Sequence, residues 1–199
     1  MDTIIRKLTD GDDLNAVSDL IYETDNCVFP HFFKDSKTSA KEILPHMIQL
    51  DTIYNKSNIY VATVEDKIIA IMVLVKSPVQ INISAYIEAF DRAGALVDST
   101  FETVMKEYYL PMECQPDGYS IACLCVDAQY RGNGIGGALL DTAMSALDPT
   151  LDVYLECPTD NESALAVYKA HGFEPLVKYA GFTGLPYYKM IRRAGRDLD

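Results

Sequence analysis

The sequence predicts an α/β fold with a mixed central β-sheet flanked by helices, and three observations predict it. Short β-branched or continuously apolar runs alternate with segments of helical periodicity along the 199 residues. Two of these runs are joined by a short polar turn, the pattern of an antiparallel hairpin. The length suits one hydrophobic core. We therefore expect one domain over residues 1–193 and a short C-terminal tail over residues 194–199.

The first elements are predicted to be a strand and a helix. TIIRKL (3–8) has the composition of a short strand. Asp12 or Asp13 can cap the helix that follows, because a carboxylate accepts hydrogen bonds from the free N–H groups of a first turn. The apolar face of this helix carries Leu14, Val17 and Ile21.

A loop, a second helix and a hairpin are expected next. DNCVFPHFF (25–33) is predicted as a loop around Pro30, whose aromatic side chains either line a pocket or fill the core. Ser39 and Glu42 have capping-box spacing, although Pro45 can mark the first turn instead. NIYVATVEDKIIAIMVLV (58–75) predicts two strands joined at residues 65–67.

Residues 79–118 form a helical insertion with one apolar face. A capping-box spacing at Ser99 and Glu102 allows a break near Asp98, so the segment is one long helix or two shorter ones. The face covers the sheet, forms a homodimer contact or closes over a substrate. Its residues are Ile87, Phe90, Gly94, Val97, Phe101, Val104 and Tyr108.

The last part of the chain predicts alternating strands and helices. IACLCV (121–126) is short and continuously apolar, as a fully buried strand would be. A helix over residues 136–147 and a strand over residues 151–157 follow it. Asn161 then caps a helix that Gly172 ends. Residues 174–182 and 187–193 are expected to be a closing pair of strands.

Composition excludes several function classes. The net charge of −12 and the pI near 4.6 disfavour a nucleic-acid partner and leave either solubility or attraction of cationic substrates as the reason for the acidity. The N-terminus has no signal-like apolar stretch, and no 18-residue apolar run occurs, so we expect a cytoplasmic protein without a membrane partner. The five cysteines predict buried, reduced thiols rather than a metal or disulfide framework.

The most informative motif is RGNGIGG, residues 131–137. Its glycines have dinucleotide-binding spacing, but five residues separate them from the preceding strand and fewer than 70 residues follow, which excludes a doubly wound nucleotide fold. A P-loop is excluded because no Lys-Ser or Lys-Thr pair follows. A glycine turn before a helix N-terminus remains an anion site, although glycines that serve packing alone are an alternative.

VDAQYRGNGIGGALL, LDVYLEC and NESALAVYKAHGF resemble, in order and spacing, the core of the GNAT superfamily of acyl-coenzyme A dependent N-acyltransferases. Arg131, Gly134 and Gly136 correspond to its R-x-x-G-x-G signature. The resemblance is close over residues 121–173. The insertion at residues 79–118 departs from the family, in which this connection is normally a short turn.

The resemblance implies a fold, a co-substrate and a set of binding residues. It implies the GNAT fold and acetyl-CoA, with no metal. The pantetheine arm would lie between strands 121–126 and 151–157, and the pyrophosphate would lie on the glycine turn. The implied binding residues are Leu124, Val126, Arg131, Gly132, Asn133, Gly134, Ile135, Gly136, Gly137, Asn161 and Tyr168.

The resemblance also implies the chemistry, transfer of an acetyl group to the primary amine of a small molecule or a peptide N-terminus. Tyr168 stands where the family carries a general acid, and a core tyrosine is the alternative. Glu156 matches the glutamate base of ribosomal-protein alanine N-acetyltransferases, and a structural carboxylate is the alternative. An acyl-cysteine is disfavoured because no histidine lies near the thiols. A non-catalytic acyl-CoA sensor is the rival function.

Overall fold

A computed structural model describes residues 2–24, 28–33, 37–97, 99–181 and 183–195. Residues 25–27 of the predicted loop, Asp98 at the predicted break and residues 196–199 of the C-terminal tail lie outside the described residues. The described strands form one mixed sheet in the order β1-β2-β3-β4-β5-β7-β6. They are β1 (Ile4–Lys7), β2 (Ile59–Val64), β3 (Lys67–Ser77), β4 (Gly118–Val126), β5 (Asp152–Pro158), β6 (Glu174–Ala180) and β7 (Pro186–Arg192).

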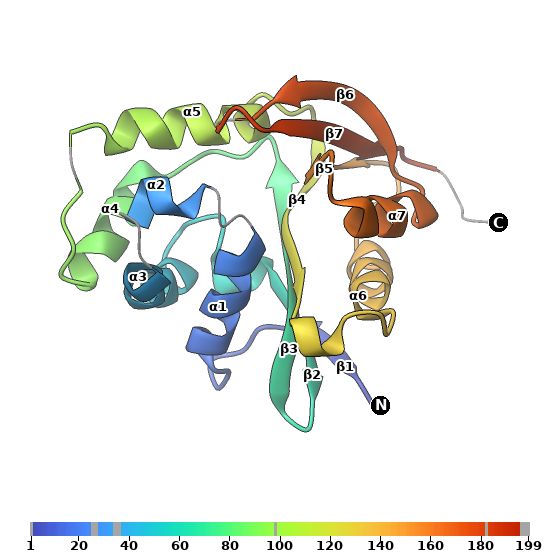
Figure 1. The fold of residues 1–199 in the computed structure, drawn as a ribbon, viewed down its shortest axis with the longest axis horizontal. Helices are drawn as coiled ribbons and strands as arrows, with labels where there is room; N and C mark the ends of the chain where they lie inside the picture. The colour runs from blue at the N-terminus through green and yellow to red at the C-terminus, as the bar shows by residue number, and fades with distance from the viewer. Residues whose placement is uncertain (1, 25–27, 34–36, 98, 182, 196–199) are drawn as a thin grey trace.

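Helices cover both faces of this sheet, so the predicted α/β class is confirmed. In Figure 1 helices α1–α5 lie on one side of the sheet, and α6 and α7 lie on the other. Two separate groups of buried apolar side chains correspond to these two faces. The α-helices are α1 (Leu14–Thr24), α2 (Phe29–Phe33), α3 (Lys37–Gln49), α4 (Ile83–Arg92), α5 (Phe101–Glu113), α6 (Ile135–Met144) and α7 (Glu162–Ala170).

The predicted hairpin is confirmed as β2 and β3. Its strands pair antiparallel up to Val64 and Lys67, which leaves a two-residue turn at Glu65 and Asp66. Both turn residues have positive φ, 49° and 62°. This is the backbone twist that suits a tight hairpin, because it matches the twist of the flanking strands.

Three local predictions in the first half of the chain were wrong. Residues 29–33 form the short helix α2 and not a loop, although its three phenylalanines fill the core, as one of the two alternatives for them expected. Helix α3 begins at Lys37, so neither Ser39 nor Pro45 marks its start. The N-cap residue of α5 is Thr100 and not Ser99. In each case tertiary packing outweighed a local signal of a few residues.

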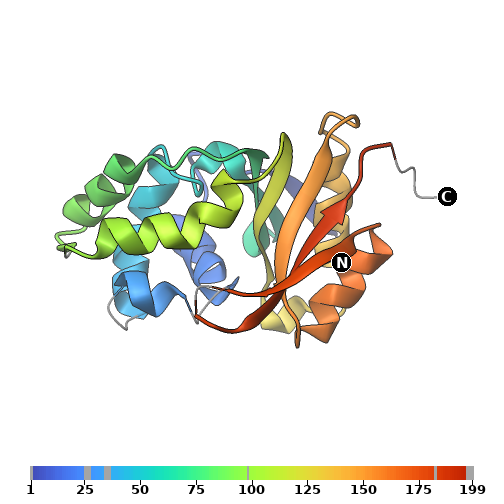
Figure 2. The ribbon, with the colours of Figure 1, turned by 90° about the horizontal axis from the view of Figure 1, so that it is seen from above.

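The helical insertion consists of two helices, α4 and α5, rather than one. Its apolar face packs largely against other helices and not, as one prediction had it, directly on the sheet. The ring of Phe90 stacks 5.9 Å from that of Phe33 and meets Phe101 edge-on at 4.9 Å. Tyr108 meets Phe32 edge-on at 5.2 Å. Figure 2 shows α5 running across this outer layer toward the β6–β7 hairpin.

The alternative between Asp12 and Asp13 as the first helix cap is decided in favour of Asp13. Its carboxylate accepts hydrogen bonds from the N–H groups of Asn15 and Ala16 at 2.9 and 3.3 Å. Asp12 instead receives both arms of the Arg6 guanidinium at 2.7 Å and the N–H of Thr9 at 2.7 Å. The Arg6 hydrogen bond is the main reason that the pKa of Asp12 lies well below its usual range.

We expect Asp12→Asn to lower the free energy of unfolding at pH 7 by about 1–3 kcal/mol, the usual cost of losing charge-assisted hydrogen bonds. A depressed pKa stabilises the fold only above the pKa of the unfolded chain, and this contribution is lost as the pH falls toward the folded pKa. The difference between variant and parent should therefore shrink below about pH 4. Urea unfolding at a series of pH values measures it; a difference independent of pH would contradict the assignment.

Candidate functional site

The sheet is split between its two parallel strands. β4 and β5 pair only from Gly118–Asp152 to Ile121–Leu155, although β4 continues to Val126 and β5 to Pro158. On its other edge β4 stays paired with β3 up to Val126. The end of β4 therefore has one edge without a neighbouring strand among the described residues.

Backbone groups of Leu124 and Val126 face this open edge. The N–H of Asp127 donates to the carbonyl of Ile69 at 2.8 Å, so these two residues form a hydrogen-bonded pair of the β3–β4 ladder. Hydrogen-bonded and non-hydrogen-bonded pairs alternate along an antiparallel ladder. Leu124 and Val126 thus occupy non-hydrogen-bonded positions opposite Met72 and Ala70, and their N–H and C=O groups point away from β3.

The glycine turn lies beside the open edge and begins α6. Gly132 and Gly134 have φ of 78° and 74°, a conformation that favours glycine, and a Cβ at either position would meet no atom within 4 Å. The first helical bond runs from the N–H of Ala138 to the carbonyl of Gly134. The N–H groups of Ile135, Gly136 and Gly137 therefore precede the helical ladder and are available to an anion.

The other residues of this turn have more local contacts. A Cβ on Gly137 would lie 2.9–3.0 Å from the ring of His171, so this glycine lets α6 approach the end of α7, as the packing alternative expects. The Asn133 side chain donates to the carbonyls of Tyr130 and Arg131 and closes the turn. Arg131 donates from Nε to the carbonyl of Val126 at 2.9 Å, so its side chain reaches back to the end of β4.

Asn161 and Tyr168 come from α7, on the same face of the sheet as α6. Asn161 is the N-cap residue of α7, because its side chain accepts from the N–H of Ala164 at 3.1 Å. Tyr168 is buried, with its ring edge-on to Phe173. Burial is the main cause that raises its pKa far above the usual range, and the thiols of Cys157, Cys123 and Cys125 contribute. Tyr168 belongs to the same group of buried apolar side chains as Cys157 and Leu155 of β5 and Ile121 of β4.

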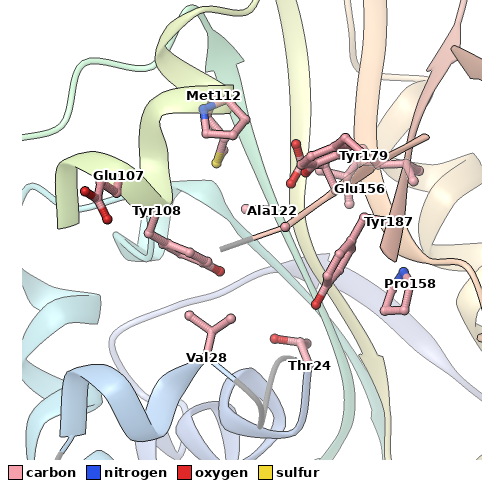
Figure 3. A pocket seen from close by; sticks show the side chains of 14 residues that line it. Thr24, Val28, Glu107, Tyr108, Met112, Ala122, Glu156, Pro158, Tyr179 and Tyr187 are labelled. Atoms are coloured by element: carbon pink, nitrogen blue, oxygen red, sulfur yellow. The ribbon is translucent and has the colours of Figure 1, made fainter. Parts of the chain in front are cut away.

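An open cleft lies where the pairing of β4 and β5 ends (Figure 3). Its floor includes Ile121 and Leu155, the last paired residues. Helices α1 and α5 form one side, and β5 with the β6–β7 hairpin forms the other. The polar and aromatic groups that line it are Thr24, Glu107, Tyr108, Glu156, Tyr179 and Tyr187.

Glu156 is the predicted catalytic residue that lines this cleft, whereas Tyr168 does not line it. The residue is exposed at the cleft wall, but the surrounding protein desolvates its carboxyl group, and this raises the pKa of Glu156 above its ordinary value. A hydrogen bond from Tyr179 and the charge of Lys189 oppose the rise. A carboxylate with a raised pKa beside a cleft is suited to accept a proton.

The acceptor side of the cleft was only partly predicted from the sequence. Of the predicted loop 25–33, the described residue that reaches the cleft is Val28. The inserted helix α5 contributes Glu107 and Tyr108, and the closing hairpin contributes Tyr179 and Tyr187. Tyr108 belonged to the recognised apolar face, but nothing local in the sequence distinguishes a cleft-lining tyrosine from a core one.

The described cysteines agree in part with the prediction that the thiols are buried. Cys123, Cys125 and Cys157 are buried and Cys114 is exposed, and no disulfide joins these four described cysteines. Burial raises the pKa of Cys125 and raises that of Cys157 to about 11. These thiols are therefore protonated at neutral pH and poor nucleophiles.

The fold and the site define an α/β protein in which a glycine turn and a helix N-terminus lie beside a split sheet. The acetyltransferase (GNAT) family matches residues 19–173, and the chain belongs to this family. Among the described residues, no helix is both long and apolar enough to cross a membrane.

Two curated relatives match part of the chain. One is an uncharacterized protein of Mycobacterium leprae, 40% identical over 86 residues. The other is the N-alpha-acetyltransferase RimI of Mycobacterium tuberculosis, 36% identical over 83 residues. Each match covers 40% of this chain, and they span 23% and 52% of the two relatives.

Solved structures share the fold over nearly the whole chain. An N-acetyltransferase from Staphylococcus aureus Mu50 superposes with a TM-score of 0.73 and 22% identity, covering 94% of this chain and 99% of that one. The structure of the NatC complex bound to Gag peptide and CoA gives a TM-score of 0.58 at 15% identity, covering 97% and 99%. At these identities the likeness concerns the fold alone.

Proposed function

We propose that the protein transfers the acetyl group of acetyl-CoA to a primary amine of a small molecule or a peptide N-terminus. One observation carries the proposal: the free N–H groups of the glycine turn and the outward-facing backbone of Leu124 and Val126 adjoin the same split in the sheet, and the split opens onto a cleft. A pyrophosphate, an amide-bearing arm and an acceptor thus each have a matching surface. Membership of the acetyltransferase (GNAT) family supports the proposal.

The binding residues divide by chemistry. The N–H groups of residues 132–137 would hold the pyrophosphate, and the backbone of Leu124 and Val126 would pair with the amides of pantetheine. Arg131 would have to release the Val126 carbonyl, or share it, when that arm binds. Asn161 can hold the arm through its side-chain N–H₂, because its oxygen is engaged as the helix cap.

In the proposed reaction Glu156 removes a proton from the acceptor ammonium, directly or through water. The neutral amine attacks the thioester carbonyl and forms the new C–N bond. The C–S bond then breaks, and the departing thiolate takes a proton from Tyr168, whose raised pKa keeps it protonated at neutral pH. The attacking nitrogen loses its remaining excess proton as the amide forms, and this proton, passed through water, restores the hydroxyl group of Tyr168. The proton held by Glu156 returns to solvent, so the products are the amide and free coenzyme A.

The first test is isothermal titration of the protein with acetyl-CoA, with NAD and ATP as controls. We expect micromolar binding of acetyl-CoA alone. Failure to bind acetyl-CoA and longer acyl-CoAs would overturn the proposal. Binding without any turnover across an amine library would instead support the rival function, an acyl-CoA sensor that has the anion site without catalysis.

We expect Glu156→Gln to lower kcat by about 10- to 100-fold and to remove the acidic limb of the kcat/KM profile. The base must be deprotonated, and because its pKa is raised, activity should fall at a higher pH than for an ordinary glutamate. A raised pKa also means that ionised Glu156 does not stabilise the fold at neutral pH. The variant should therefore unfold at the same or a higher urea concentration.

Glu88→Gln, on α4, is the matched control, since Glu88 pairs with Arg92 at the surface and does not line the cleft. A loss of stability in Glu156→Gln with an unchanged pH profile would identify Glu156 as a structural carboxylate.

A further inference from the structure

The cleft presents aromatic rings from opposite sides. Figure 3 shows Tyr108 of α5 and Tyr187 of β7 reaching into it from its two walls. Tyr179 lies next to Tyr187, with ring centroids 6.4 Å apart. Met112 and Val28 add apolar surface. A flat, apolar body fits between such walls better than a hydrated one does.

These rings are held in place by the surrounding structure. Tyr108 is packed edge-on against both Phe32 and Tyr109, at 5.2 and 4.7 Å. A Cβ on Gly181 would lie 2.8 Å from the ring of Tyr187, so the absence of a side chain there allows the ring to lie against the hairpin backbone. The aromatic walls are therefore already positioned before a ligand enters, which lowers the entropic cost of binding.

The described charged residues that line the cleft are all acidic. Its described lining residues include two glutamates, Glu107 and Glu156, and no lysine, arginine or histidine. Lys189 offsets the charge of Glu156 from the neighbouring strand but does not line the cleft. Glu107 is exposed on α5 and has no ion pair within the described part of the chain, whereas Glu102 on the same helix pairs with Lys106. The cleft thus favours cations and disfavours carboxylates.

We propose that the acceptor is a primary amine with an aromatic body and no free carboxylate, and that Tyr108 and Glu107 of the inserted helix select it. This inference rests on the proposed function for the transfer step, but the selection itself is a property of the cleft. Tyr108 and Tyr187 hold the ring, and Glu107 repels acceptors that carry a carboxylate. Both an arylalkylamine and a peptide with an aromatic N-terminal residue have the required chemistry.

The test compares four acceptors, tyramine, tyrosinamide, tyrosine and putrescine, by calorimetric binding with and without saturating CoA and by acetylation rate. Tyramine or tyrosinamide should bind at least about tenfold more tightly than tyrosine, the effect expected of one partly screened charge. Tighter binding of tyramine would indicate a small amine as the acceptor, and tighter binding of tyrosinamide would indicate a peptide N-terminus. Tyrosine binding as tightly as tyramine, or putrescine binding more tightly, would overturn the proposal.

Two variants assign the selection to α5. Glu107→Gln should narrow the preference for tyramine over tyrosine by about three- to tenfold, and Glu102→Gln, the charge-matched control on the same helix, should leave it unchanged. Tyr108→Leu, which keeps an apolar side chain, should weaken the binding of tyramine about tenfold and leave the binding of putrescine unchanged. If the preference for tyramine were unchanged in Glu107→Gln and also in Tyr108→Leu, the assignment would be refuted. If acetyl-CoA fails to bind, the proposed function fails, while the binding ratios without CoA still decide this inference.

Discussion

Gly134→Asp is expected to weaken acetyl-CoA binding by at least about 100-fold. Gly134 is the N-cap residue of α6, with φ of 74°, and the space beside it holds no protein atom within 4 Å. A carboxylate placed there would stand where the pyrophosphate must approach and would cancel the favourable field of the helix N-terminus. Calorimetric titration with acetyl-CoA measures the loss.

Two control variants separate charge from backbone strain. Aspartate is a good cap and tolerates positive φ better than most residues, so Gly134→Asp should fold. Gly134→Asn has nearly the same shape without the charge and should weaken binding less. Gly94→Asp places the same residue at φ of 69° in open space far from the turn in the sequence and should bind normally. Undiminished affinity in Gly134→Asp would remove the anion-site argument.

Tyr168→Phe should lower kcat by about 10- to 100-fold while acetyl-CoA binds with unchanged affinity. The substitution removes only the hydroxyl group and keeps the ring that packs against Phe173. Burial raises the pKa of Tyr168, so its hydroxyl group is protonated at neutral pH and can donate to the thiolate as the C–S bond breaks. Steady-state kinetics with saturating amine, together with calorimetry, test both halves of this expectation.

Tyr154→Phe is the control, because Tyr154 is also a buried tyrosine, on β5, and its hydroxyl group contacts Asp152 rather than the split. It should retain full turnover. If Tyr168→Phe also retained full turnover, Tyr168 would be a core tyrosine, and the thiolate would have to receive its proton from elsewhere.

Local signals in the sequence predicted the glycine turn and the helix caps well. The glycine turn is defined within seven consecutive residues, and Gly132 and Gly134 have the positive φ that such a turn requires. Asn161 caps α7 as its position before an amphipathic segment indicates. These features depend on backbone conformation and helix termini, which neighbouring residues largely determine.

Local signals failed where two residues competed for the same role. Asp12 and Asp13 are equivalent as caps in sequence, but the Arg6 side chain, brought close by the return of the chain from β1, pairs with Asp12. Ser39 and Pro45 both resemble helix starts, yet α3 begins at Lys37, and Ala40, directly after Ser39, is already buried. Contacts outside the helix itself, and not the residue type at the cap position, decided the choice between Asp12 and Asp13.

The sequence by itself determined the α/β class, the glycine turn and the helix that follows it, because each is encoded by periodicity and backbone preference over a few adjacent residues. Only the tertiary structure decided the composition of the cleft. Tyr108 and Tyr187 are 79 positions apart in the sequence, and they face one another because α5 crosses toward the hairpin and the pairing of β4 and β5 ends at Ile121. Such long-range contacts depend on how all the layers pack together, so no short segment of the sequence contains them.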